Sequence, residues 1–129
     1  MRAAAVMLVS LAAAWSGVAA CADAPSFAAH VLPLFKSRCL VCHMPGAESG
    51  ELSLHPKVAY ANLVGARATQ GPWLRVAPGK PDESYLYLKV TGRHLGAGGS
   101  GERMPFNEAP LTTEQVDLLR RWIETGANP

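Results

Sequence analysis

The sequence predicts a small all-α domain, and three observations lead to this expectation. The chain has 129 residues, which allows one domain at most. Apolar residues recur at helical spacing near both ends of the chain, and no βαβ pattern is present. The residues with this spacing are Phe27, Val31, Leu34 and Phe35 in the first segment and Val116, Leu119, Trp122 and Ile123 in the last. We therefore expect an N-terminal and a C-terminal helix that pack together.

The motif around which the chain is organised is Cys39-Leu40-Val41-Cys42-His43, which has the form CxxCH. Two thiols at this spacing add across the two vinyl groups of a haem, and the histidine that follows ligates the iron. A zinc site would need a second cysteine pair, and the one further thiol, Cys21, lies in the leader. A redox dithiol of thioredoxin type would belong to a βαβ unit. The motif therefore predicts one covalently bound haem c.

An export signal is expected ahead of the domain. Residues 1–20 begin with Arg2, continue through an apolar, alanine-rich stretch and end in small residues, as a secretory signal peptide does. The end of this segment, Val18-Ala19-Ala20-Cys21, also resembles the lipobox of bacterial lipoproteins, so lipidation at Cys21 and ordinary cleavage both stay open. We expect residues 21–25 to be a linker, residues 26–129 to be the domain, and the protein to be periplasmic, either soluble or lipid-anchored to a membrane.

The low net charge argues against nucleic acid as a partner. The formal charge is +2, and loss of Arg2 with the leader lowers it to +1. Two haem propionates would bring the loaded protein close to neutral. Nucleic-acid-binding domains carry a strong positive charge, which this chain lacks.

The first predicted helix leads directly into the CxxCH motif. Ser26 is a typical N-cap residue, and the helix is expected to reach Cys39. Pro33 has no N–H to donate to Ala29, so we expect a kink or a break there.

After the motif, residues 44–51 are polar and contain glycine, which predicts a loop. Leu52 and Leu54 then indicate an extended segment along the haem edge. We expect a backbone carbonyl of this stretch to accept the N–H of the His43 imidazole, as metal-bound histidines generally require.

Two short helices are predicted in the middle of the chain. One covers residues 57–64, with Val58, Ala61 and Leu63 or Val64 available to face the core. The other is capped by Asp82 and runs to Thr91, where Gly92 stops it. Apolar surface along it comes from Tyr85, Leu86, Leu88, Lys89 and Val90. Trp73, Arg75 and Tyr85 are candidates to bind the haem propionates, with plain core packing as the alternative.

Met104 is the candidate for the second axial ligand of the iron. It follows a glycine-rich loop, which lets the backbone bend closely around a planar group, and Pro105 stiffens the chain behind it. A thioether is a soft, neutral ligand that favours ferrous iron. His30, His55 and His94 stay open as rival ligands.

The last helix carries the clearest local signals. Thr112 and Gln115 form a capping box at its start, and Gly126 stands at its end. Its apolar stripe is expected to pack on the first helix and to cover the haem edge.

Taken together, these segments resemble the planctomycete-type group of monohaem cytochrome c domains, within the class I cytochrome c fold. The resemblance covers nearly the whole chain after the leader. It rests on Pro33 with the CxxCH motif, Gly50-Glu51-Leu52-Ser53-Leu54, Val76-Ala77-Pro78-Gly79-Lys80-Pro81 with Ser84-Tyr85-Leu86, Met104-Pro105, and Leu111-Thr112 with Trp122-Ile123 and Gly126-Ala127. The second proline usual after Met-Pro is Phe106 here. The resemblance implies thioether links at Cys39 and Cys42, His43 and Met104 as axial ligands, and terminal helices that cross.

An iron with two protein ligands has no open position for a substrate, so the sequence favours an electron carrier rather than an enzyme. The expected partners are redox proteins, namely a dehydrogenase as donor and an oxidase or another cytochrome as acceptor, together with the cytochrome c maturation machinery. Two alternatives stay open. One is a haem-based gas sensor or peroxidase-like enzyme with a displaceable Met104, and the other is the haem subunit of a larger dehydrogenase complex.

Overall fold

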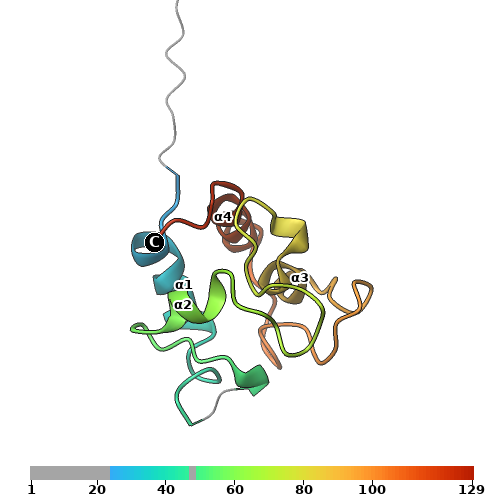
Figure 1. The fold of residues 1–129 in the computed structure, drawn as a ribbon. Coiled ribbons are helices and arrows are strands. Elements are labelled where there is room, and N and C mark those ends of the chain that lie inside the picture. The colour runs from blue at the N-terminus through green and yellow to red at the C-terminus, as the bar shows by residue number, and fades with distance from the viewer. Residues whose placement is uncertain (1–23, 47–48) are drawn as a thin grey trace, which may run out of the picture.

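The computed structural model describes residues 24–46 and 49–129, and within them the regular secondary structure is helical (Figure 1). Isolated β-bridges occur in this part of the chain, but no strand, which confirms the all-α prediction. The expected signal peptide and Cys21 lie outside the described residues. The helical elements are η1 (Phe27–Val31), α1 (Leu32–Arg38), η2 (Ser49–Glu51), α2 (Ala59–Leu63), η3 (Pro81–Glu83), α3 (Tyr85–Thr91) and α4 (Thr113–Glu124).

The N-terminal helix starts where predicted and changes its winding before Pro33. The Ser26 hydroxyl accepts the N–H of Ala29 at 3.3 Å, so Ser26 is the N-cap. The first turn, η1, is π-helical, and the N–H of Leu32 donates to the carbonyl of Phe27, five residues back. Proline lacks an N–H, and its ring would collide with the carbonyl four residues earlier in an α-helix. The expected break therefore takes the form of a wider turn, after which α1 continues to Arg38.

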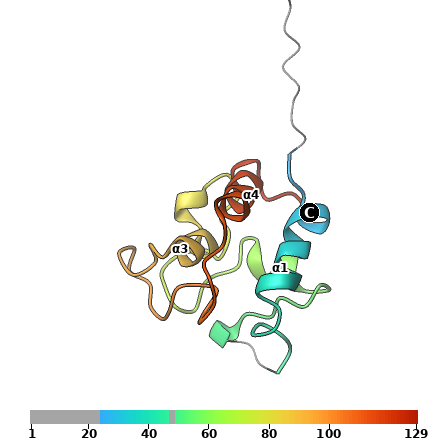
Figure 2. The same cartoon turned by 180° about the vertical axis from the view of Figure 1, so that it is seen from behind.

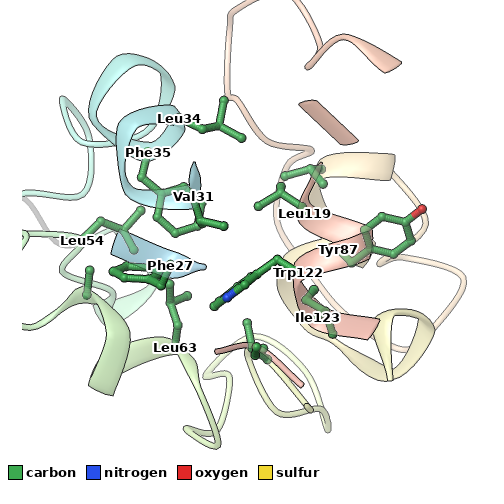
Figure 3. Close-up of a cluster of buried hydrophobic side chains, with 14 of the residues drawn as sticks. Phe27, Val31, Leu34, Phe35, Leu54, Leu63, Tyr87, Leu119, Trp122 and Ile123 are labelled. Carbon is green, nitrogen blue, oxygen red and sulfur yellow. The ribbon is translucent and has the colours of Figure 1, made fainter. Parts of the chain in front are cut away.

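The two ends of the chain share one apolar core. Trp122 of α4 and Phe27 of η1 are buried, with ring centroids 5.7 Å apart, and Figure 3 shows Trp122 directed toward Phe27. The Asn128 carbonyl accepts both the Phe27 N–H at 2.9 Å and the Trp122 indole N–H at 2.8 Å. The C-terminus accordingly lies beside η1 in both views of the fold (Figures 1 and 2). The predicted packing of the last helix on the first is confirmed.

Both ends of α4 follow the local sequence signals. At its start, the Thr112 hydroxyl accepts the Gln115 N–H at 3.3 Å, and the Gln115 side chain accepts the Thr112 N–H at 3.0 Å. At its end, Gly126 adopts φ +106, and the N–H groups of Gly126 and Ala127 donate to the carbonyls of Ile123 and Trp122. This is a Schellman motif, so the predicted capping box and glycine stop are both confirmed.

Two details of the middle segment differ from the prediction. Leu63 faces the core as predicted, but Val58 and Ala61 are exposed, and Ala59, four residues before Leu63, is buried instead. The helix begins at Ala59 rather than at Lys57, and Val58 is its N-cap residue.

The third helix also begins later than predicted. Asp82 does not cap it, because residues 81–83 form the separate turn η3 and the Asp82 carboxylate pairs with Arg93 at 2.7 Å. The N-cap of α3 is Ser84, and its first two N–H groups, from Tyr85 and Leu86, donate to the carbonyls of Leu74 and Arg75 at 2.9 Å each. A neighbouring extended segment therefore supplies the acceptors that a capping side chain would otherwise provide. The predicted stop at Gly92 is confirmed, with φ +75.

Candidate functional site

The four residues proposed from the sequence as haem-binding line one cavity. Cys39, Cys42, His43 and Met104 all contribute to its wall, which encloses about 320 Å³. Apolar side chains from three segments, namely the stretch after η2, α2 and α3, also line it: Leu52, Leu54, Leu63, Leu86 and Val90. A cavity of this size and character is typical of a small-molecule or cofactor site.

The end of α1 presents the two cysteines at different depths. The N–H of Cys39 closes the helix on the Phe35 carbonyl at 2.9 Å, and the chain then turns so that the His43 N–H approaches the carbonyls of Cys39 and Leu40 at 3.2 and 3.1 Å. Cys42 is exposed, and Cys39 is half-buried. Burial raises the pKa of the Cys39 thiol to about 11, partly opposed by the neighbouring Arg38 cation.

The imidazole of His43 is held by the segment that follows the loop. Its Nδ1 lies 3.1 Å from the carbonyl oxygen of Leu52, and the Leu54 N–H donates to the His43 carbonyl at 2.7 Å. A carbonyl only accepts, so this bond places the proton on Nδ1 and leaves Nε2 with a free lone pair. Burial lowers the pKa of His43, which also favours the neutral ring. The carbonyl contact predicted for this stretch is confirmed, and Leu52 provides it.

Met104 reaches the cavity from a segment 104 − 43 = 61 positions after His43 in the sequence. It is half-buried, and its N–H donates to the carbonyl of Lys89 in the last turn of α3 at 3.1 Å. The glycine-rich loop before it folds against α3, so Met104 and Pro105 meet the wall that the CxxCH segment forms.

The rival histidines do not line this cavity. His94 is 2% exposed, and its Nε2–H donates to the Gly101 carbonyl at 2.8 Å. His30 accepts the Ser26 N–H at 3.1 Å, and His55 accepts the Lys57 N–H at 3.3 Å. Among the residues that the structure describes, His43 is the one histidine in the cavity wall.

The three candidates for propionate binding separate in the structure. Arg75 and Tyr85 line the cavity, whereas Trp73 does not and donates its indole N–H to the Ala97 carbonyl at 2.8 Å. Arg75 donates to the carbonyls of Asn62 and Glu51 at 2.9 Å and of Gly50 at 3.3 Å. The Tyr85 hydroxyl donates to the Gln70 carbonyl at 2.8 Å. Both side chains therefore hold backbone segments of the cavity wall.

Two charged residues that the sequence did not indicate as site residues, Arg38 and Lys89, also line the cavity. Arg38 donates to the Ala109 carbonyl at 2.6 Å and lies 3.5 Å from the Glu108 carboxylate, which ties the end of α1 to the chain beyond Met104. Lys89, predicted to contribute apolar surface along α3, is buried, and its ammonium donates to two backbone carbonyls. The sequence signal for this role was the spacing of Tyr85 and Lys89, four residues apart on one helix face just before a glycine-rich loop.

The donor set fits a covalently attached haem. Two thiols, a neutral imidazole with its Nε2 lone pair free and a thioether are the side chains that such a group requires, and all of them face one mainly apolar cavity. In residues 24–46 and 49–129, no three His, Cys, Asp or Glu side chains cluster as ligands of a bare metal ion.

In the part of the chain that the structure describes, no helix has the length and apolarity needed to cross a membrane. No family model, no curated protein and no solved structure matches the chain.

Proposed function

We propose that this chain is a class I c-type cytochrome that carries single electrons between a dehydrogenase and a downstream acceptor in the periplasm. The observation that supports the proposal is the convergence of Cys39, Cys42, His43 and Met104 on one cavity. The first three are neighbours in the sequence, but Met104 is remote from them, and its place in the same wall is what a second axial ligand requires.

Each of these side chains would have a defined task. Cys39 and Cys42 would anchor the haem through thioether bonds, and His43 would ligate iron through Nε2 while the Leu52 carbonyl holds the ring in orientation. Met104 would occupy the other axial position and keep small molecules from it. When bound in this way, a haem supplies a one-electron couple between ferric and ferrous iron. The apolar wall, which includes Leu54 and Leu63, would exclude water from the site.

A redox partner would meet the protein beside this cavity. Phe106 lines the cavity and is 52% exposed, and Met44 and Val41, next to the proposed attachment site, are 43% and 75% exposed. Small apolar contacts of this kind suit weak, rapidly dissociating encounters between electron-transfer proteins. Maturation would further require the machinery that attaches haem to CxxCH motifs.

An absorption experiment tests the proposal. The protein is produced in a host with cytochrome c maturation machinery, and its spectrum is recorded oxidised and reduced, with and without carbon monoxide. We expect haem that stays with the polypeptide after denaturation, a weak long-wavelength band of methionine bound to ferric iron, and no uptake of carbon monoxide. Met104→Ala should lose the band and bind carbon monoxide, whereas Met44→Ala, which removes an exposed methionine, should behave as the wild type.

Two results would contradict the proposal. Wild-type protein without covalent haem, under conditions in which a control cytochrome is matured, would remove its basis. Ready binding of carbon monoxide by the wild type would instead point to a sensor or a peroxidase-like enzyme with an open iron position.

A further inference from the structure

Lys89 is a buried lysine whose ammonium group binds the backbone of the loop before Met104. The residue is 7% exposed, and its Nζ donates to the carbonyls of Ser100 and Glu102, at 2.8 Å each. Moving a charged group out of water is costly unless hydrogen bonds compensate it. An apolar side chain would fill the same space without the cost of desolvating an ammonium group. The hydrogen bonds to the loop are therefore what a lysine adds at this position.

The main chain of Lys89 holds the same loop. Its carbonyl accepts the N–H of Met104 at 3.1 Å, so residues 99–104, here called the Met104 loop, are attached to one residue of α3 through both its side chain and its backbone. The carbonyl between the two that Lys89 binds, that of Gly101, accepts from His94 at 2.8 Å. Three successive carbonyls of the loop are thus taken by buried cationic or imidazole side chains.

The glycines of the loop permit this close approach. A Cβ on Gly101 would lie 3.2 Å from the Lys89 Nζ, and this residue has φ +75, which favours glycine. Tyr85, one turn before Lys89 on α3, accepts the Ser100 N–H at 3.2 Å, and its ring centroid lies 5.6 Å from the Lys89 Nζ. Tyr85 and Lys89 therefore form one platform, four residues apart on the same helix face, on which the loop lies.

We propose that Lys89 is the positioning residue that fixes the Met104 loop and thereby holds the Met104 thioether at the cavity. The inference rests on the proposed function for the role of Met104 as an iron ligand. A glycine-rich loop has many conformations, and a ligand on it is bound only in the fraction of molecules that present it correctly. The hydrogen bonds of Lys89 restrict the loop to that conformation before any ligation takes place.

The test compares three variants of the full chain, purified after maturation. Lys89→Met keeps an unbranched side chain of similar helix propensity but removes the donors. Lys89→Arg restores a cation that donates to carbonyls. Lys36→Met removes an exposed lysine of α1 and is the matched control. Amide hydrogen exchange is measured in the Met104 loop and in α4, and the long-wavelength methionine-to-iron band is recorded in the ferric state.

We expect Lys89→Met to speed exchange of the Met104 amide about 10-fold to 100-fold, to leave exchange in α4 unchanged, and to weaken the band. Lys89→Arg should recover part of the band, and Lys36→Met should match the wild type. Unchanged exchange of the Met104 amide in Lys89→Met would overturn the inference, as would equal acceleration in α4, since that would show general destabilisation.

The failure of this inference differs from that of the proposed function. Wild-type protein with covalent haem and a normal band, together with an unaffected Lys89→Met variant, would refute the role of Lys89 alone. Wild-type protein without covalent haem would refute the proposed function and with it the ligand role of Met104, while amide exchange would still decide whether Lys89 holds the loop.

Discussion

Arg75 allows a quantitative prediction about the wall of the cavity. Its guanidinium donates to carbonyls of two chain segments: to that of Asn62 in α2 at 2.9 Å, and to those of Glu51 and Gly50 in η2 at 2.9 and 3.3 Å. Glu51 immediately precedes Leu52, whose carbonyl orients the His43 imidazole. Replacement by methionine keeps an unbranched stem and removes every donor.

The expected loss of stability follows from the geometry of these bonds. A hydrogen bond from a charged donor contributes about 1.5–3 kcal/mol when it is buried. Arg75 is half-buried, so water can replace part of each bond, and the bond to Gly50 is long. We therefore count about 1 kcal/mol for each of the two shorter bonds. Arg75→Met should lower the free energy of unfolding by about 2 kcal/mol, which corresponds to a fall in Tm of about 8–16 °C for a domain of this size.

Denaturant unfolding followed by circular dichroism measures this difference. Arg67→Met is the matched control, because Arg67 is exposed and its replacement removes the same charge. Arg75→Lys separates charge from geometry. A single ammonium cannot reach the carbonyls of both segments as the planar guanidinium does, so the stability of this variant should lie between those of the wild type and Arg75→Met. If Arg75→Met and Arg67→Met differ by less than about 0.5 kcal/mol, the bridging role of Arg75 is wrong.

Two further predictions concern the glycine-rich loop and the thiols. Gly99→Ala should destabilise the protein by at least about 2 kcal/mol in thermal unfolding, because its Cβ would lie 2.6 Å from the ring of Tyr85. The control Gly96→Ala should be nearly neutral, because its Cβ would lie at an ordinary 3.8 Å from its nearest neighbour. Equal losses of stability in the two variants would contradict this packing. In reduced, haem-free protein at pH 8, iodoacetamide should modify Cys42 at least about tenfold faster than Cys39. Cys42 is exposed, whereas burial raises the pKa of Cys39 to about 11, so little of the Cys39 thiol is present as the reactive thiolate. Peptide mass spectrometry measures both modification rates, which should become equal when urea unfolds the protein. Equal rates in the native protein would contradict the partial burial of Cys39.

Contacts within one helical turn and contacts between remote segments differ in how far the sequence predicts them. Signals that act over one helical turn were reliable: the Ser26 cap, the capping box at Thr112 and the glycine stops of α3 and α4 are all present. The cap assigned to Asp82 was wrong, since the acceptors for the first N–H groups of α3 come from Leu74 and Arg75. A side-chain cap can be read locally, but an acceptor supplied by another segment cannot.

Lys89 was misjudged for a related reason. The sequence predicts that it contributes apolar surface along a helix of mostly apolar residues. In the structure the ammonium is buried because the Met104 loop offers it two carbonyls. Those partners lie 11 and 13 positions away along the chain, beyond the range of any periodic pattern.

The sequence by itself determined the helical class of the fold, the ends of its last helix and the presence of a CxxCH motif, because each depends on neighbours within a few residues. Only the tertiary structure decided that Leu52 provides the carbonyl at His43, that Met104 lies in the same cavity wall as the two cysteines, and that His94 turns to the Gly101 carbonyl instead. These three contacts depend on how segments that are remote in the sequence pack against one another. That packing involves the core that η1 and α4 share, which no local spacing in the sequence describes.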